Sequence, residues 1–186
     1  MPSLRGIRQW PAAIPNVLWT PLTAVGLVLV VGTFGVIADQ PWLYPSLGPS
    51  ALVIAEFPGH QAARFRDVVL GHLIGLGAGL AAVWLVGADA TAVITQEVSA
   101  ERVVAAALAM AGTIIGLMVL RVSQTPAAST TLVVALGGLR PTLHDVIAVV
   151  VGVLILGACG EFVRRVRLNA TQGSRDDTAS MSSKDG

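Results

Sequence analysis

The chain has 186 residues, of which 54% are hydrophobic and only 12% are charged, and its formal net charge at pH 7 is +1. An ordinary soluble domain carries roughly 25% charged residues, so this chain has too little polar surface to cover a water-soluble fold. The composition therefore excludes a soluble globular domain, offers no basic patch for a nucleic acid, and indicates an integral membrane protein in contact with the lipid bilayer.

Long uncharged segments predict four transmembrane helices. Four long blocks without a charged residue cover 18–38, 68–88, 103–120 and 146–160, and a fifth uncharged block, 122–139, contains the shorter proline-led stretch 124–135. A helix of about 20 apolar residues is long enough to cross the hydrocarbon layer of a bilayer. The first block follows Arg5 and Arg8 but is too long for a secretory signal peptide, so we expect it to remain as a membrane helix.

The apolar blocks form one predicted membrane domain, residues 18–166, between two polar ends. Residues 1–17 precede the first helix, and residues 167–186 are rich in Thr, Ser, Gly and Asp. A segment of that composition cannot bury enough surface to offset the entropy lost on ordering. We therefore predict a disordered tail after residue 166.

Two shorter stretches, 41–55 and 124–135, differ from the long blocks. Each begins with proline and small hydroxyl residues and ends in a short apolar run. Proline is tolerated in the first turn of a helix because the N–H that it lacks would be unpaired there. We expect each stretch to be an extended lead-in followed by a half-helix, one beginning near Gly48 and the other near Ala127.

The two stretches also align with each other. An alignment that places Ser50 on Thr130 matches the apolar runs that follow, and the next long helix then opens with aspartate in both halves. This predicts two repeats, about 18–88 and 102–166, each made of a long helix, a half-helix and a long helix. Shared apolar composition is the alternative. Paired proline-led short helices of this kind indicate a binding site near the membrane midplane.

The distribution of arginine predicts the topology. If both short stretches complete a crossing, the chain crosses six times, and only Arg102 and Arg140 lie opposite the termini. The arginines on the cytoplasmic side are then Arg5, Arg8, Arg64, Arg66, Arg121, Arg164, Arg165 and Arg167. If the short stretches are re-entrant instead, the chain crosses four times and four arginines lie outside. The positive-inside rule favours six crossings, both termini in the cytoplasm of a multi-pass cell-membrane protein, and a 3+3 inverted repeat.

Glycines recur at helical spacing in two of the long blocks. Gly71, Gly75 and Gly79 follow one another every four residues, as do Gly112 and Gly116. Such stripes allow helix backbones to approach closely in lipid. They predict a compact bundle, and they also offer faces through which two copies of the chain would form a homo-oligomer.

The half-helix ends are candidate anion sites. In an inverted arrangement their amino ends meet near the midplane, each with unpaired N–H groups and about half a positive charge. Hydroxyl groups there would add donors without a full charge, so a small monovalent anion would be released easily. Simple helix capping is the alternative. The residues predicted to line the site are Gly48, Ser50, Ala128, Ser129, Thr130 and Thr131.

His72 is the ionisable residue that stands out within the long blocks. An ionisable group at membrane depth is a functional candidate, here as a proton acceptor in proton-coupled uptake or as an anion contact. A hydrogen-bonded structural histidine is the alternative. The sequence holds no metal-ligand grouping, no nucleotide-binding glycine fingerprint and no nucleophile with an evident base, so we expect neither an enzyme nor a cofactor or metal.

Several ordered motifs resemble the HPP family of integral membrane proteins. They are Gly48-Pro49-Ser50-Ala51-Leu52, then Pro58, then Arg66-Asp67-Val68-Val69-Leu70-Gly71-His72-Leu73, then Pro126-Ala127-Ala128-Ser129-Thr130-Thr131-Leu132. The resemblance spans about 22–162 and implies a small polytopic protein, usually described with four membrane helices. Some plant and cyanobacterial members have been assigned to nitrite transport. Where the family has His-Pro-Pro, this chain has Gln124-Thr125-Pro126, so a role of the family histidine does not carry over.

Residues and resemblance together predict a transporter or channel-like permease for a small monovalent anion, with nitrite as a candidate. The alternative is a membrane protein of the same family that acts in assembly or regulation without transporting a solute.

Overall fold

The computed structural model describes residues 16–88, 99–139 and 142–182. Within these ranges every regular secondary-structure element is a helix. Its elements in chain order are α1 (Asn16–Ile37), α2 (Leu47–Glu56), the short 3-10 helix η2 (Gln61–Ala63), α3 (Phe65–Val86), α4 (Ala100–Val119), α5 (Ala127–Ala135) and α6 (Leu143–Ser182). The four long helices and the two half-helices agree with the prediction, and the half-helices begin within one residue of the expected positions.

The long helices have the length and the surface of membrane spans. Four segments qualify by length and hydropathy: Val17–Ile37, Phe65–Val86, Ala100–Val119 and Leu143–Thr171. Large apolar side chains on α1 and α4 point away from the bundle, among them Val17 at 82% and Met118 at 73% exposure. Such a surface is typical of helices in contact with lipid, and with four candidate spans it agrees with the predicted polytopic membrane protein.

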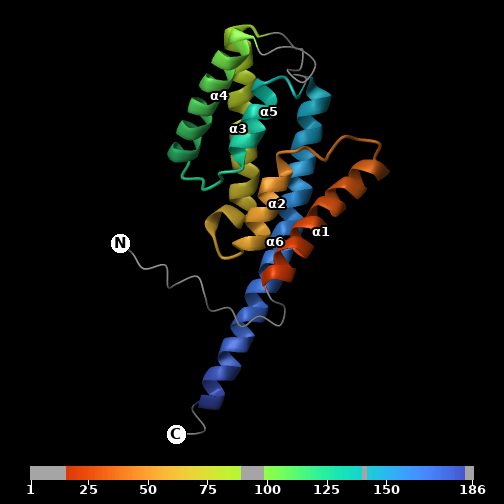
Figure 1. Ribbon diagram of the computed structural model, residues 1–186, viewed down its shortest axis with the longest axis vertical. Helices are drawn as coiled ribbons and strands as arrows, with labels where there is room; N and C mark the ends of the chain where they lie inside the picture. The colour runs from red at the N-terminus through yellow and green to blue at the C-terminus, as the bar shows by residue number, and fades with distance from the viewer. Residues whose placement is uncertain (1–15, 89–98, 140–141, 183–186) are drawn as a thin grey trace.

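The half-helix α2 crosses the bundle instead of turning back. Before it, the chain packs on α6 at Gly152, where an added Cβ would clash with the Trp42 carbonyl oxygen. After it, the Phe65 N–H donates to Glu161 Oε2 at 3.4 Å. Gly152 and Glu161 are nine residues apart on α6, which corresponds to about 14 Å along the helix. In Figure 1 the chain accordingly rises along α1, descends through α2 and rises again along α3.

The half-helix α5 crosses in the opposite direction (Figure 1). Before α5, the Ser123 N–H donates to the Asp67 carboxylate at 3.2 Å, near the start of α3. At its end, Arg102 from the first turn of α4 donates to the Ala135 carbonyl at 3.0 Å. Within the described residues, the chain thus passes six times between the two ends of the bundle.

The two sets of three helices make corresponding contacts. α1 packs on α2 and α6, while α4 packs on α5 and α3, and each half-helix lies against the third helix of the other set. A Cβ atom built on Gly79 of α3 would lie 2.8 Å from Val134 Cβ of α5, and one built on Gly160 of α6 would lie 2.6 Å from Ile54 Cδ1 of α2. Val134 and Ile54 occupy aligned positions in the two predicted repeats.

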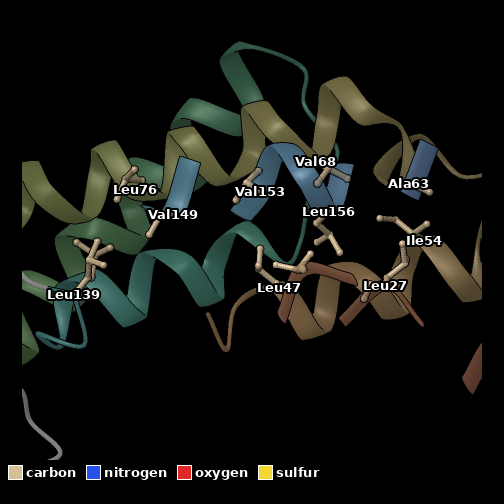
Figure 2. Close-up of a cluster of buried hydrophobic side chains, with 13 residues drawn as sticks. Leu27, Leu47, Ile54, Ala63, Val68, Leu76, Leu139, Val149, Val153 and Leu156 are labelled. Atoms are coloured by element: carbon tan, nitrogen blue, oxygen red, sulfur yellow. The ribbon is translucent and has the colours of Figure 1, made fainter. Parts of the chain in front are cut away.

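The apolar core lies where α1, α2, α3 and α6 meet. Leu27, Ile54, Val68, Val153 and Leu156 are fully or almost fully buried and face one another in this region (Figure 2). Burial of side chains of this size stabilises the contact by about 1.5–3 kcal/mol each in water, whereas in lipid the gain comes from close packing.

The glycine stripes are covered by other helices of the same chain. A Cβ on Gly75 would lie 2.6 Å from the carbonyl oxygen of Ala127, so α3 can approach α5 this closely only with glycine at this position. Similarly, a Cβ on Gly116 of α4 would lie 2.7 Å from Ile74 of α3. Close packing through glycine is as predicted. The prediction that these faces join two subunits is corrected, because helices of the same chain already cover them.

Helix α6 extends well beyond the bundle (Figure 1). A disordered tail was predicted from residue 167, and this is corrected: the backbone stays helical to Ser182. The guanidinium of Arg167 lies 4.5 Å from the ring centroid of Trp19 in α1, and the Thr171 hydroxyl donates to the Arg167 carbonyl at 3.1 Å. These contacts and the lack of proline after residue 166 allow the helix to continue.

Most described arginines lie at one end of the bundle. The Arg164 guanidinium donates to the Pro58 carbonyl, and Gln61 donates to the Arg121 carbonyl. The arginines at this end are Arg64, Arg66, Arg121, Arg164, Arg165 and Arg167. Arg102 lies near the opposite end, whereas Arg5, Arg8 and Arg140 are outside the described residues. This distribution is the one expected for six crossings; that the arginine-rich end faces the cytoplasm stays a prediction.

Candidate functional site

His72 lies at the meeting point of the two half-helices. It is the eighth residue of α3, at the start of the third turn, and it is 1% exposed. Its Nε2 atom lies 2.8 Å from the Ser50 hydroxyl of α2, and its Nδ1 atom lies 2.5 Å from the Thr130 hydroxyl of α5. One imidazole therefore links both half-helices through its two ring nitrogens.

The two hydroxyls occupy equivalent places in their helices. Ser50 is the fourth residue of α2 and Thr130 is the fourth residue of α5, and these are the two positions that the internal alignment superimposed. Because the helices run in opposite directions along the bundle, both amino ends, and hence the positive ends of both helix dipoles, point towards the level of His72.

The N–H groups at these amino ends are already bonded, in contrast to the prediction. In α5 the N–H groups of Ala127 and Ala128 donate to the carbonyls of Gln124 and Thr125, at 3.2 Å and 3.1 Å. In α2 the Leu47 N–H donates to the Tyr44 carbonyl at 3.0 Å. The turn before each helix supplies these acceptors. The donors available to a ligand are thus side chains, and the backbone contributes its dipole.

Gln124, just before α5, extends the network. Its Nε2 group donates to the Ser50 hydroxyl at 3.2 Å, and its side chain is 2% exposed. Among the described residues, its Oε1 atom is one of two buried side-chain polar atoms without a hydrogen-bond partner. A buried unpaired amide end costs about 1–3 kcal/mol, and such groups often belong to sites with a ligand or a water molecule.

The hydrogen bonds around His72 can run in either direction. Neutral imidazole carries one donor and one acceptor nitrogen, and each hydroxyl can donate and accept. The two tautomers of His72 therefore differ in the direction of the hydrogen bonds to Ser50 and Thr130. All four side chains, including Gln124, are at most 2% exposed, so this conformation is closed towards both ends of the bundle.

The other residues predicted for the site lie elsewhere. The Thr131 hydroxyl faces Thr113 of α4 at 2.7 Å and donates to the Ala127 carbonyl. The Ser129 hydroxyl donates to the Pro126 carbonyl in the turn before its own helix. The remaining two are not brought to His72: Ala128 is half-buried, and Gly48 is exposed with open space around its α-carbon.

Two members of the polar interior were not predicted. The sequence pattern identified Gln124 only as a departure from His-Pro-Pro. A side-chain amide directly before a proline-led helix is the feature that could have indicated a place in the network. Thr113 is a single hydroxyl residue in an apolar helix, and no sequence pattern indicated its place in the polar interior.

Comparison with known proteins agrees with the resemblance described above. The family model described as "HPP, transmembrane region" matches residues 10–172. No curated protein and no solved structure matches the chain.

Proposed function

The chain belongs to the HPP transmembrane family, and on this premise we propose that it is a transporter or channel-like permease for a small monovalent anion, with nitrite as the first candidate. The observation that carries the proposal is the meeting of Ser50 and Thr130, from two oppositely directed half-helices, on the single imidazole of His72.

The chemistry of this junction suits a weakly held anion. Two helix dipoles contribute partial positive charge, and the hydroxyls and the Gln124 amide contribute donors. Ser50, Thr130 and Gln124 carry no charge at physiological pH. A site with donors but without a fixed cation binds a monovalent anion loosely enough to release it, which conduction and transport require.

The corresponding contacts of the two helix sets support an inverted repeat. Two network bonds, His72 to Thr130 and Gln124 to Ser50, join the first set to the second. Rocking of one set against the other would break both bonds and open the closed junction to one side. Alternating access of this kind is the usual mechanism of transporters built from inverted repeats.

The alternative, a non-transporting assembly or regulatory protein, drew on glycine faces for subunit contacts. Those faces are filled within the chain, so no structural observation now favours this alternative.

A flux screen tests the proposal. Purified protein in sealed liposomes should accelerate the passage of at least one of nitrite, nitrate, formate and chloride over protein-free liposomes, and nitrite is expected to be among them. Equal rates with and without protein for all four anions, for protein shown to be inserted and folded, would refute a transport function.

A further inference from the structure

A second candidate site lies at the arginine-rich end, less than two turns of α3 before His72, and shares no residue with the His72 network. A surface hollow there is lined by residues from the start of α3 and the lower part of α6: Arg64, Phe65, Arg66, Ala158, Glu161, Phe162, Arg164 and Arg165. It is open to the outside of the bundle. Four of the eight lining residues are arginines and one is an acid, so the hollow carries a formal charge of +3.

Both carboxylate oxygens of Glu161, the one acidic residue that lines the hollow, accept hydrogen bonds. Arg164 donates from Nε and Nη2 to the two Glu161 oxygens at 2.8 Å and 2.7 Å, and Arg165 donates from Nε to Oε1 at 2.7 Å. The Phe65 N–H also donates to this carboxylate. Glu161 therefore orients the guanidinium groups of Arg164 and Arg165 along the side of the hollow. Its single negative charge neutralises only one of their two positive charges.

The remaining two arginines have no acidic partner in the described structure. Arg64 and Arg66 are exposed, and among the described residues neither makes an ion pair or a side-chain hydrogen bond. Guanidinium groups favour bidentate hydrogen bonds with phosphate. Arg64 and Arg66 lie beside Arg164 and Arg165, which Glu161 already orients. This cluster of guanidinium groups indicates an anionic, oxygen-rich ligand.

The apolar residues beside the charges define the class of ligand. Phe162 is 70% exposed and Phe65 is 38% exposed, and both lie on membrane helices next to the arginines. A soluble anion gains nothing from exposed aromatic rings, whereas a phospholipid presents a phosphate and an acyl chain together. Basic hollows between membrane helices are known to suit anionic headgroups.

We propose that this hollow binds the phosphate headgroup of an anionic phospholipid, with Arg64 and Arg66 as the principal phosphate contacts and Phe65 and Phe162 against the acyl chains. The proposal does not depend on transport, because the site is separate from the His72 network. It gives the arginine-rich end a defined lipid partner in addition to a role in orientation.

The test compares lipid binding by the full chain and three variants in detergent. Phosphatidylglycerol should raise the thermal unfolding temperature of the parent and appear as a bound adduct in native mass spectrometry, and phosphatidylcholine should do neither. The double variant Arg64→Gln/Arg66→Gln should bind phosphatidylglycerol on the order of 10-fold or more weakly, since each basic residue contributes about 1 kcal/mol. Arg121→Gln, at the same end but outside the hollow, should bind like the parent.

Three outcomes would overturn the proposal. They are equal binding of phosphatidylglycerol by the parent and the double variant, equal binding of phosphatidylglycerol and phosphatidylcholine by the parent, and a stabilisation by inorganic phosphate alone as large as that by phosphatidylglycerol. Arg165→Gln is a second variant: its side chain is 71% exposed, so folding should be retained while binding weakens.

Discussion

His72 is a membrane-embedded imidazole held from both sides by hydroxyl groups. The Ser50 and Thr130 oxygens lie 2.8 Å and 2.5 Å from its two nitrogens, so the ring is fixed in orientation and either tautomer is hydrogen-bonded on both sides. A purely structural histidine would not need hydroxyl partners at equivalent positions of the two half-helices. The arrangement suits a residue that exchanges a proton as the two helix sets move.

Replacing His72 by glutamine tests this role. If His72 exchanges a proton during uptake, the His72→Gln variant should lose the pH dependence of anion uptake that the parent shows, because glutamine has no titratable group. Uptake is measured in liposomes at a series of external pH values. A pH profile equal to that of the parent, for a variant that unfolds at a similar temperature, would return His72 to a structural role.

Part of the junction could be predicted from the sequence because local pattern carries it. The internal alignment placed Ser50 on Thr130, and the structure brings both to one histidine. The bond from Gln124 to Ser50 could not be predicted, since it joins residues 74 positions apart and depends on how the helices pack. The pairing of N–H groups before α5 depends on the local turn geometry, which the proline pattern did not specify.

Among the elements, α3 and α5 pack in a way that depends strictly on side-chain size. The stripe that includes Gly75 and Gly79 brings the α3 backbone against α5, and this contact positions Thr130 opposite His72. Loss of this close approach would change both stability and the junction.

A pair of alanine substitutions on α3 tests this contact. In Gly75→Ala the new Cβ would lie 2.6 Å from the Ala127 carbonyl, a backbone atom that cannot yield easily, so we expect destabilisation of about 1–3 kcal/mol. In Gly77→Ala the Cβ meets nothing within 4 Å, and better helix propensity should leave stability unchanged or slightly higher. Thermal unfolding in detergent measures both. Equal unfolding temperatures for the two variants would contradict the packing.

The ends of the elements were predicted unevenly. Three long helices begin and end within a few residues of the predicted blocks, because charge and hydropathy change sharply there. The end of α6 was not predicted, because polar composition alone does not stop a helix. Arg167 packs on Trp19 of α1, and the Thr171 hydroxyl donates to the Arg167 carbonyl of its own helix.

At the scale of the whole molecule, six passages through the bundle bring the described start of α1 and the lower part of α6 to the same end, where Trp19 lies under Arg167. The same end carries most of the arginines. The positive-inside rule then predicts a cytoplasmic position for this end.

Cysteine labelling tests the orientation. In a Cys159→Ser background, Gly59→Cys introduces a thiol in an exposed turn with open space around it, and His144→Cys introduces one at the opposite end. A membrane-impermeant thiol reagent should label Gly59→Cys only in inside-out vesicles and His144→Cys only in right-side-out vesicles. Labelling of both positions from the same side would contradict the six-crossing topology.

The central claim is that an anion passes where the two half-helices meet, and the flux of nitrite through Thr130→Val and Ser129→Ala tests it most directly. Both substitutions remove one hydroxyl from α5, but the Thr130 hydroxyl faces His72 and the Ser129 hydroxyl faces the turn before its own helix. In liposomes containing equal amounts of folded protein, we predict a loss of about 10-fold or more in flux for Thr130→Val, since a buried hydrogen-bond partner contributes about 1–3 kcal/mol, and near-parental flux for Ser129→Ala. Parental flux in Thr130→Val, or an equal loss in both variants, would contradict the account.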